Sequence, residues 1–472
     1  MRADLAVIGA GPAGLAASLA AAARGVRVAL VDAGPEAGGQ FYRQPAPALG
    51  SARHQGRTWR RLREGLDRHI AAGRIHHLKD HHVWCVERES AGFAVHALLG
   101  PEQEEPVVVR AAAVLLATGA HEKVLPFPGW TLPGVVTAGG AQALLKGGLV
   151  VPGRRAVVAG TGPLLLPVAT GLAAAGTTVA ALVESADPGR FARGARALAA
   201  EPGKAVEAAG YGARLLRHRV RVLVRHTVVA AEGADRLTGV AVAALDADGR
   251  VRPGTERRIP CDCLAVGHGL LPHTDLAETL GCRVDGGRVG VDDEQRTDVP
   301  GVWAAGEATG VGGAALALAE GHLAGGSIAA RLAGAAPDPR GGEHAAERRA
   351  ALRRFAAALD RAYAPRAGWA ERITDDTVVC RCEEVRAGAV REAVHELGAG
   401  DLRTVKLLTR AGMGWCQGRM CGTAVAGIAG CPETVTRRPF ARPVPLGVLA
   451  REPEEGRRPE QGRPQPQQDE LG

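Results

Sequence analysis

The sequence has few aromatic residues: phenylalanine, tryptophan and tyrosine together make up 3% of its 472 residues. So few rings leave little surface on which nucleic-acid bases could stack. The formal net charge is +8, but the basic residues are nearly all arginine and are scattered along the chain instead of forming a stripe. We therefore expect no nucleic-acid partner.

The sequence also lacks an uncharged apolar run of the roughly 20 residues that a membrane-spanning helix needs. The Ala-rich stretch from Ala13 to Ala23 is too short. No charged and apolar leader precedes the first strand, because MRADLAVIGAGPAG begins at once with a strand and a glycine loop. We expect a cytoplasmic protein without a transmembrane segment, one that would reach the inner face of the membrane only through partners.

The cysteines are not arranged for disulfide chemistry. Nine cysteines in a reducing compartment favour metal or redox use over disulfide bonds. No C-x-x-C pair occurs, which excludes the dithiol chemistry of a disulfide reductase. Cys85, Cys282 and Cys431 stand alone and are expected to be buried thiols, and Cys261 and Cys263 are expected to be structural residues of a strand.

The first residues of the chain predict a βαβ unit that binds a dinucleotide. An apolar run is followed by a G-x-G-x-x-G loop and a helix, and Asp32 ends the second strand. The glycines permit a tight turn and a close approach to a pyrophosphate at the helix N-terminus, while the acid can hold ribose hydroxyls. The loop residues are Gly9, Gly11, Pro12, Ala13 and Gly14.

A second unit of the same kind spans residues 155–185, but its motif is imperfect. Gly160 and Gly162 occupy the first two glycine positions, whereas Leu165 stands at the third, where glycine normally allows tight packing of helix on strand. Glu184 ends the next strand. Binding of NAD(P) or ATP therefore stays open beside a retained fold that has lost its ligand.

Four further cysteines form two close pairs, Cys380-x-Cys382 and Cys416-x4-Cys421. Four thiolates can hold a 2Fe-2S cluster if the chain folds back so that the pairs meet. The helical apolar spacing of residues 383–397 and 401–410, with glycines between, predicts such a return. The C-x-C half fits a zinc knuckle poorly. A zinc site and an unmetallated core are the alternatives.

Additional motifs follow the order found in one group of flavoproteins. The strand VLLATGA carries Thr118 and Gly119, GGQFYRQ carries Gln40, and a late G-E motif is formed by Gly306 and Glu307. Over roughly residues 1–330 this order resembles the flavoproteins with two dinucleotide-binding domains that are related to glutathione and thioredoxin reductases. The resemblance implies an α/β fold in which these residues, the first glycine loop and its acid bind FAD. The group usually has Gly-Asp at the late motif, so the glutamate is a departure.

A closer resemblance covers nearly the whole chain. The stretch TGAHEKVLPFPGWTLPGVVTAGGAQALLK, the cysteine segment and RPVPLGVLA together resemble the larger, FAD- and iron-sulfur-containing subunit of bacterial amino-acid and opine dehydrogenases. Examples are the A subunit of opine oxidase, the B subunit of hydrogen cyanide synthase and the alpha subunit of proline or D-hydroxyproline dehydrogenases. The cysteine segment is similar to bacterioferritin-associated ferredoxin (BFD), which implies that all four cysteines hold a 2Fe-2S cluster.

The resemblance implies a division of the chain into five parts. A glutathione-reductase-like FAD-binding domain comprises residues 1–125 and 265–333, and a second nucleotide-binding-like domain, residues 126–264, is inserted into it. A connector with a helix, residues 334–373, leads to a small helical BFD-like domain, residues 374–431. A C-terminal extension, residues 432–472, is expected to be disordered from about residue 451, because it is rich in proline, glutamine and charge.

The implied function is electron transfer within a hetero-oligomeric amine or amino-acid dehydrogenase. An FAD-containing partner subunit would oxidise proline, hydroxyproline, an opine or glycine, and a quinone or other acceptor would take the electrons. Further options that the resemblance implies are FMN at an interface between subunits and a small ferredoxin-like third subunit.

His121 is the one candidate for a catalytic histidine; contact with the cofactor loop or a partner is the alternative. The competing function is a self-sufficient NAD(P)H-dependent flavin and iron-sulfur reductase. The leucine at the third glycine position disfavours it.

Overall fold

The structure is a computed structural model that describes residues 1–50, 56–187, 189, 201–364, 367–432 and 438–450. The tail that was predicted to be disordered lies outside these residues. No helix in the described ranges is both long and apolar enough to cross a membrane.

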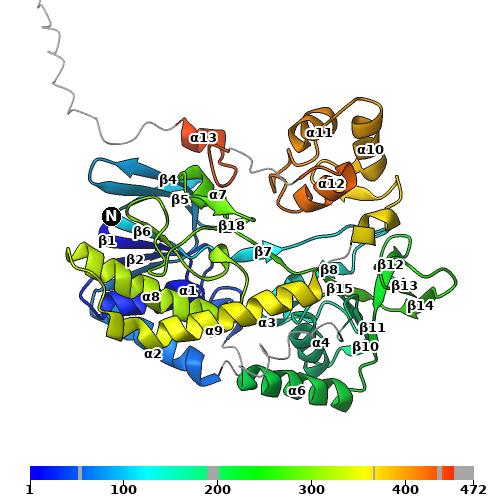
Figure 1. Ribbon diagram of the computed structural model, residues 1–472, viewed down its shortest axis with the longest axis horizontal. Helices are drawn as coiled ribbons and strands as arrows, with labels where there is room; N and C mark the ends of the chain where they lie inside the picture. Colours follow the sequence, from blue (N-terminus) through cyan, green and yellow to red (C-terminus); the bar gives the residue numbers. More distant parts are fainter. Residues whose placement is uncertain (51–55, 188, 190–200, 365–366, 433–437, 451–472) are drawn as a thin grey trace, which may run out of the picture.

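The first domain is built on one mixed sheet with helices packed against it (Figure 1). Its early elements are β1 (Arg2–Ile8), α1 (Pro12–Ala22), β2 (Val28–Val31), η1 (Pro47–Leu49), α2 (Gly56–Ala71), β3 (Ile75–Leu78), β4 (His81–Glu89), β5 (Gly92–Leu99) and β6 (Glu105–Leu116). The late elements, which return after the inserted domain, are α7 (Asp275–Thr279), β17 (Val284–Asp285), β18 (Arg288–Val289), β19 (Val302–Ala304), η3 (Gly306–Thr309) and α8 (Ala314–Leu332).

Strand β1 lies at the centre of the sheet, parallel to β2 and β6, so that Ile8 pairs with both Val31 and Leu116. Strand β19 joins β6 in parallel, with Ala304 beside Leu116. Parallel strands place their carboxyl ends at one edge of a sheet, which is where ligands bind in such folds. The loops after β1, β2, β6 and β19 therefore meet at one edge.

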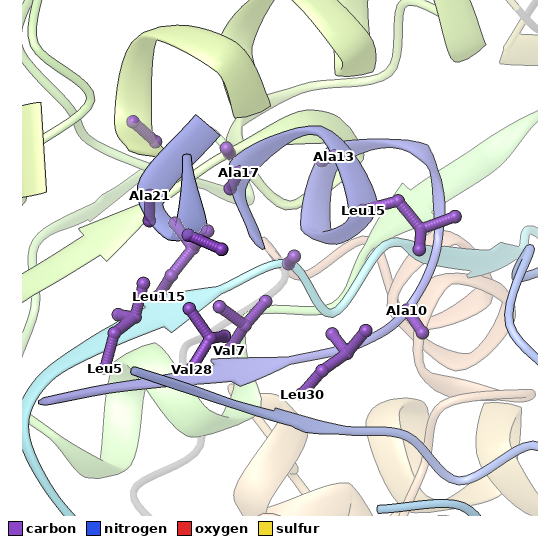
Figure 2. Packing of buried hydrophobic residues seen from close by; sticks show 14 of the residues in the cluster. Leu5, Val7, Ala10, Ala13, Leu15, Ala17, Ala21, Val28, Leu30 and Leu115 are labelled. Carbon is purple, nitrogen blue, oxygen red and sulfur yellow. The ribbon is translucent and has the colours of Figure 1, made fainter. Parts of the chain in front are cut away.

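The core of this domain is made of short apolar side chains between the sheet and α1. Helix α8 lies against α1, and glycine makes the approach possible: a Cβ added to Gly321 would lie 2.1 Å from the carbonyl oxygen of Ala13. Figure 2 shows the packed residues, which include Leu5, Val7, Val28, Leu30 and Leu115 from the strands and Ala13, Ala17 and Ala21 from α1.

Two short antiparallel strands, β7 (Ala120–Glu122) and β16 (Leu270–Pro272), connect the two nucleotide folds, and we call them the hinge strands. The inserted domain has a parallel sheet in the order β11-β10-β9-β15-β8 and a separate antiparallel sheet, β12-β13-β14. The predicted boundary at residue 265 falls inside β15, which pairs with β9, so the chain leaves this domain only at β16. Its elements are β8 (Val135–Thr137), α3 (Ala138–Gly147), β9 (Arg155–Gly160), α4 (Leu165–Ala174), β10 (Thr178–Glu184), α6 (Pro202–Arg217), β11 (Val222–Val224), β12 (His226–Glu232), β13 (Gly239–Ala244), β14 (Arg257–Pro260) and β15 (Cys263–Gly267).

The remaining elements belong to the predicted connector, to the cysteine segment and to the C-terminal extension. Helix α9 is the long yellow helix of Figure 1, and it runs from α8 towards the inserted domain. The predicted helix over 383–397 is shorter than expected, because Val385 instead pairs with Cys380 in a small hairpin. The elements are α9 (Pro339–Tyr363), η4 (Ala367–Arg372), β20 (Val378–Cys380), β21 (Val385–Arg386), α10 (Ala387–His395), α11 (Leu402–Thr409), α12 (Gly422–Ala429) and α13 (Leu446–Leu449).

Candidate functional site

The first glycine loop is tightly packed at Gly9 and Gly14 and open at Gly11. A Cβ added to Gly9 would lie 2.3 Å from the carbonyl oxygen of Ala117, and one added to Gly14 would lie 1.8 Å from that of Gly9. At Gly11, by contrast, only the Cα of Gly39 lies within reach, at 4.0 Å. Helix α1 starts there with proline in its first turn. The open face and the helix N-terminus fit a pyrophosphate.

The acid at the end of β2 lies beside this loop. Burial raises the pKa of Asp32 to about 6, although backbone N–H groups of Ala10, Ala33 and Gly34 act in the opposite direction. The carboxylate is thus mostly ionised at pH 7 and can accept hydrogen bonds from ribose hydroxyls.

The other predicted FAD residues lie at the same edge of the sheet. Gly39 packs on the first glycine loop and brings Gln40 beside it; Gln40 accepts a hydrogen bond from Arg43 at 2.5 Å. Thr118 and Gly119 follow β6, which ends next to β1. These residues therefore lie around one edge of the sheet, and we call the region between them the FAD-type groove.

The late G-E loop lies against the start of α1. Gly306 has φ +77°, and a Cβ on it would lie 2.8 Å from the Cβ of Ala13. Burial raises the pKa of the neighbouring Glu307, and a hydrogen bond with the backbone of Gly313 opposes the change. The contact between Gly306 and Ala13 brings this acid to the glycine loop.

A buried ion pair stabilises the loop that carries Gly306 and Glu307. The carboxylate of Glu320, on α8, is fully buried and accepts hydrogen bonds from Gly306 N at 2.9 Å and Thr309 Oγ1 at 3.0 Å. Arg353, on α9, donates to the same carboxylate from Nε at 2.9 Å and to the carbonyl oxygen of Gly310 at 2.9 Å. The predicted connector helix is thus part of the first nucleotide site.

Sequence reasoning missed this pair because the two side chains come from different helices. No local sequence pattern gives a partner for the glutamate of α8.

The second glycine loop differs from the first at the start of its helix. Gly160 is packed against β15, since a Cβ there would lie 1.8 Å from the carbonyl oxygen of Gly267. Pro163 is the counterpart of Pro12, yet α4 begins only at Leu165, whose side chain is buried. The bulk of Leu165 at the third glycine position explains the shifted helix start.

The acid of the second fold is bonded within the protein. Glu184 is 7% exposed and accepts hydrogen bonds from Gly162 N at 3.0 Å and Ala186 N at 2.8 Å. Burial raises its pKa to about 7, against the effect of these backbone groups. The same burial leaves little of the carboxylate exposed to a ribose.

The C-terminal end of α9 lies against the second glycine loop. The hydroxyl of Thr161, in the glycine loop, donates to the carbonyl oxygen of Tyr363, the last residue of α9, at 3.3 Å. A cavity beside this contact has a volume of about 40 Å³, and Ala362, Trp369 and Arg372 are among the residues that line it. Ligand pockets usually measure about 300–1,000 Å³, whereas a water molecule takes about 30 Å³.

The four paired cysteines lie together in the last domain. Cys380 and Cys421 are buried, Cys416 is half-buried and Cys382 is exposed. Burial raises the pKa of the Cys421 thiol, and the neighbouring Cys380, Cys416 and Cys382 raise it further, Cys380 partly through a side-chain hydrogen bond. Within the described residues no three potential ligands are drawn together as in a metal centre.

The backbone around the pairs fits a bulky group held by sulfur. Gly414 lies so close to Cys382 that a Cβ added to it would be 2.2 Å from the Cβ of that cysteine. Gln417 and Gly418 both have positive φ, at +52° and +83°, which turns the loop between Cys416 and Cys421. The four thiols and this tight loop fit a 2Fe-2S cluster.

The isolated cysteines differ in burial. Cys85, Cys261, Cys263 and Cys282 are buried, as expected. The expectation for Cys431 is wrong: it is half-exposed, because it follows the C-terminal glycine of α12 and lies at the end of the domain.

His121 lies on hinge strand β7 and packs on a second histidine. The ring centroids of His121 and His273 are 4.6 Å apart. Burial, together with His273, lowers the pKa of His121 to about 4, and its Nδ1 has no hydrogen-bond partner among the described residues. A backbone group of Arg419, in the cysteine loop, also contacts it. His121 therefore lies between the nucleotide folds and the cysteine domain.

Both the nucleotide folds and the cysteine segment match known families. Residues 3–322 match the family model for pyridine nucleotide-disulphide oxidoreductases, and residues 378–429 match the model for the BFD-like 2Fe-2S binding domain. The chain is 36% identical to hydrogen cyanide synthase subunit HcnB of Pseudomonas aeruginosa, over 88% of this chain and 90% of that protein.

Two further relatives extend over almost the full length. The A subunit of opine oxidase from Agrobacterium tumefaciens is 33% identical, over 96% of this chain and 92% of that protein. Among solved structures, L-proline dehydrogenase from P. horikoshii has the same fold, with a TM-score of 0.64 and 22% identity over 96% of this chain and 80% of that one.

Proposed function

Because this chain belongs to the pyridine nucleotide-disulphide oxidoreductase family, together with HcnB and the A subunit of opine oxidase, we propose that it is the electron-transfer subunit of a hetero-oligomeric amine or amino-acid dehydrogenase or oxidase. One observation carries the proposal: an FAD-type groove and a four-cysteine site lie in the same chain, on either side of hinge strands β7 and β16. When bound, FAD would supply two-electron chemistry and a 2Fe-2S cluster one-electron transfer.

The residues of the first groove have distinct tasks in this proposal. Gly11 and the N-terminus of α1 face the pyrophosphate, and Asp32 accepts hydrogen bonds from the adenosine ribose. Glu307 takes the place that aspartate has in related flavoproteins and faces the ribityl chain. Thr118 and Gly119 form the wall after β6, and Gln40 lies over the loop.

The cysteine segment supplies the second redox site. Cys380, Cys382, Cys416 and Cys421 would hold the cluster, which the two pairs permit because the chain folds back through α10 and α11. Zinc is the alternative metal, and the C-x-C spacing argues against it.

We infer further that the second fold takes up neither NAD(P) nor ATP. Support comes from the C-terminal end of α9, which contacts Thr161 of the second glycine loop beside a cavity of about 40 Å³, and from the backbone hydrogen bonds that hold Glu184. This argues against a self-sufficient NAD(P)H-dependent reductase.

A separate partner protein then has to oxidise the amine, and its electrons pass to this chain and on to a quinone or other acceptor. The name of one relative, opine oxidase, favours an opine or a similar amino compound as the class of substrate, and proline, hydroxyproline and glycine are the other candidates. FMN at the interface and a third, ferredoxin-like subunit remain predictions that analysis of a co-purified complex would test.

The decisive experiment is spectroscopy of the anaerobically purified chain. We expect a flavin absorption band and, after dithionite, the EPR signal of a reduced 2Fe-2S cluster. NADH and NADPH should leave the flavin oxidised. Zinc without an EPR signal would refute the electron-transfer role, and rapid bleaching of the flavin by NADH would establish the reductase instead.

A further inference from the structure

Asp275, the first residue of α7, binds two arginines from the C-terminal part of the chain. Arg438 Nη1 lies 2.9 Å from its Oδ1, and Arg419 reaches both carboxylate oxygens, with Nη2 at 3.1 Å from Oδ1 and Nε at 3.2 Å from Oδ2. The three side chains are 18–22% exposed. This is a mostly buried triad between parts of the sequence that lie far apart.

Arg419 connects the triad to the cysteine site. It lies in the loop between Cys416 and Cys421, and its Nη1 donates to the carbonyl oxygen of Cys416 at 3.2 Å. It also donates to the carbonyl oxygen of Ala441, which follows the cysteine domain. One guanidinium thus joins a cysteine of the loop to the carboxylate of Asp275.

The other side of Asp275 is joined to the wall of the FAD-type groove. His273 lies two residues earlier, and its Nδ1 is 3.7 Å from Asp275 Oδ2. The backbone N–H of His273 donates to the carbonyl oxygen of Gly119 at 2.9 Å, and its carbonyl oxygen accepts from Thr118 Oγ1 at 2.8 Å. Asp275 is therefore connected to the cysteine loop through Arg419 and to Thr118 and Gly119 through His273.

The charges around Asp275 stabilise its ionised form. Burial alone would favour the neutral acid, but the neighbouring His273 and the charges of Arg419 and Arg438 outweigh it and lower the pKa of Asp275 to about 2. A carboxylate with two guanidinium groups in a mostly buried position holds its partners in one geometry, because charge-assisted hydrogen bonds fix orientation as well as distance.

We propose that Asp275 is a positioning residue that fixes the Cys416–Cys421 loop against the hinge strands of the nucleotide folds and so sets the path between the two redox sites. The inference rests on the proposed function, because it takes these cysteines as cluster ligands. It assigns Asp275 no contact with the cofactors themselves.

The test compares Asp275→Asn with Asp376→Asn in the full chain. Asp376 pairs with Arg386 at 2.9 Å on the exposed side of the cysteine domain, so its variant removes the same charge without touching the loop. In hydrogen–deuterium exchange we expect the amides of residues 412–421 to exchange at least about tenfold faster in Asp275→Asn and at the wild-type rate in Asp376→Asn. Equal protection of the loop in wild type and Asp275→Asn would overturn the proposal.

A second measurement separates this proposal from the proposed function. After partial reduction, electron exchange between flavin and cluster should be at least several-fold slower in Asp275→Asn, with an unchanged flavin spectrum.

If Asp275→Asn does not fold, Arg438→Gln removes one of the two partners and should give the same changes to a smaller extent. An unchanged loop in that variant would also overturn the proposal. A wild-type chain without a cluster would refute the proposed function, while the exchange comparison would still test the anchor.

Discussion

Arg353 on α9 and Glu320 on α8 form an ion pair in which the carboxylate is fully buried and Arg353 Nη2 lies 2.6 Å from Glu320 Oε1. The pair supports the loop that carries Glu307. It therefore links the stability of the first domain to the geometry of its nucleotide groove.

Arg353→Met should destabilise the chain by about 3 kcal/mol, because it removes the nearer cation of a buried carboxylate and leaves only Arg349, whose Nε lies 3.8 Å from Glu320 Oε1. The measurement is denaturant unfolding of the first domain, followed together with FAD release. Arg331→Met is the matched control: its pair with Glu294, at 2.6 Å, is partly exposed and should contribute much less to stability. Equal effects of the two substitutions would contradict the role given to Arg353.

Gly414→Ala should prevent assembly of the iron-sulfur site. The new Cβ would lie 2.2 Å from the Cβ of Cys382, a distance at which one of the two must move. We expect the iron content per chain to fall several-fold. Gly400→Ala, where an added Cβ meets nothing within 4 Å, should keep the wild-type iron content.

Cys421→Ser should abolish the EPR signal of the reduced cluster while FAD stays bound, because the thiol is buried and the other three paired cysteines lie near it. Cys431→Ser removes a thiol that is half-exposed and stands apart from the pairs. That variant should keep the signal. A signal lost in both variants, or in neither, would mean that the ligand assignment is wrong.

Glu184 should make stability depend on pH. Its pKa in the folded chain is raised to about 7, so its contribution to stability is full below its ordinary pKa and is lost as the pH rises through 7. The free energy of unfolding should therefore fall by about 3 kcal/mol at most between pH 5 and pH 8. Denaturant unfolding at a series of pH values measures it.

Glu184→Gln should flatten this dependence, whatever its effect on absolute stability. Glu232→Gln, which removes an exposed carboxylate paired with Arg258, should leave the dependence in place. A wild-type slope in Glu184→Gln would show that the dependence comes from other groups.

The parts of the site that could be predicted are those in which local pattern and chemistry coincide. The glycine loop before Pro12 and the acid Asp32 stand at spacings that one βαβ unit fixes. The paired cysteines were recognisable because metal ligands need close spacing within each pair. Leu165 signalled an altered second loop, and the structure shows its effect in the late start of α4.

The parts that could not be predicted depend on contacts between distant segments. No local pattern relates Arg353 to Glu320, or Arg419 to Asp275, because each pair is joined only by the packing of separate elements. The same holds for Tyr363, whose carbonyl meets the second glycine loop. Tyr363 ends α9, a helix that the sequence predicted only as part of a connector.

The position of α9 limits how the protein can be divided. This helix gives Arg353 to the first nucleotide fold, and its last residue, Tyr363, contacts the glycine loop of the second. A fragment that ends before α9, although it keeps the complete sequence match to the flavoprotein family, would expose the Glu320 carboxylate and leave the second fold uncovered. The iron-sulfur domain therefore cannot be separated from the flavoprotein domains, because the helix that connects them, α9, is packed within the flavoprotein. The domains have to be expressed and studied as one chain.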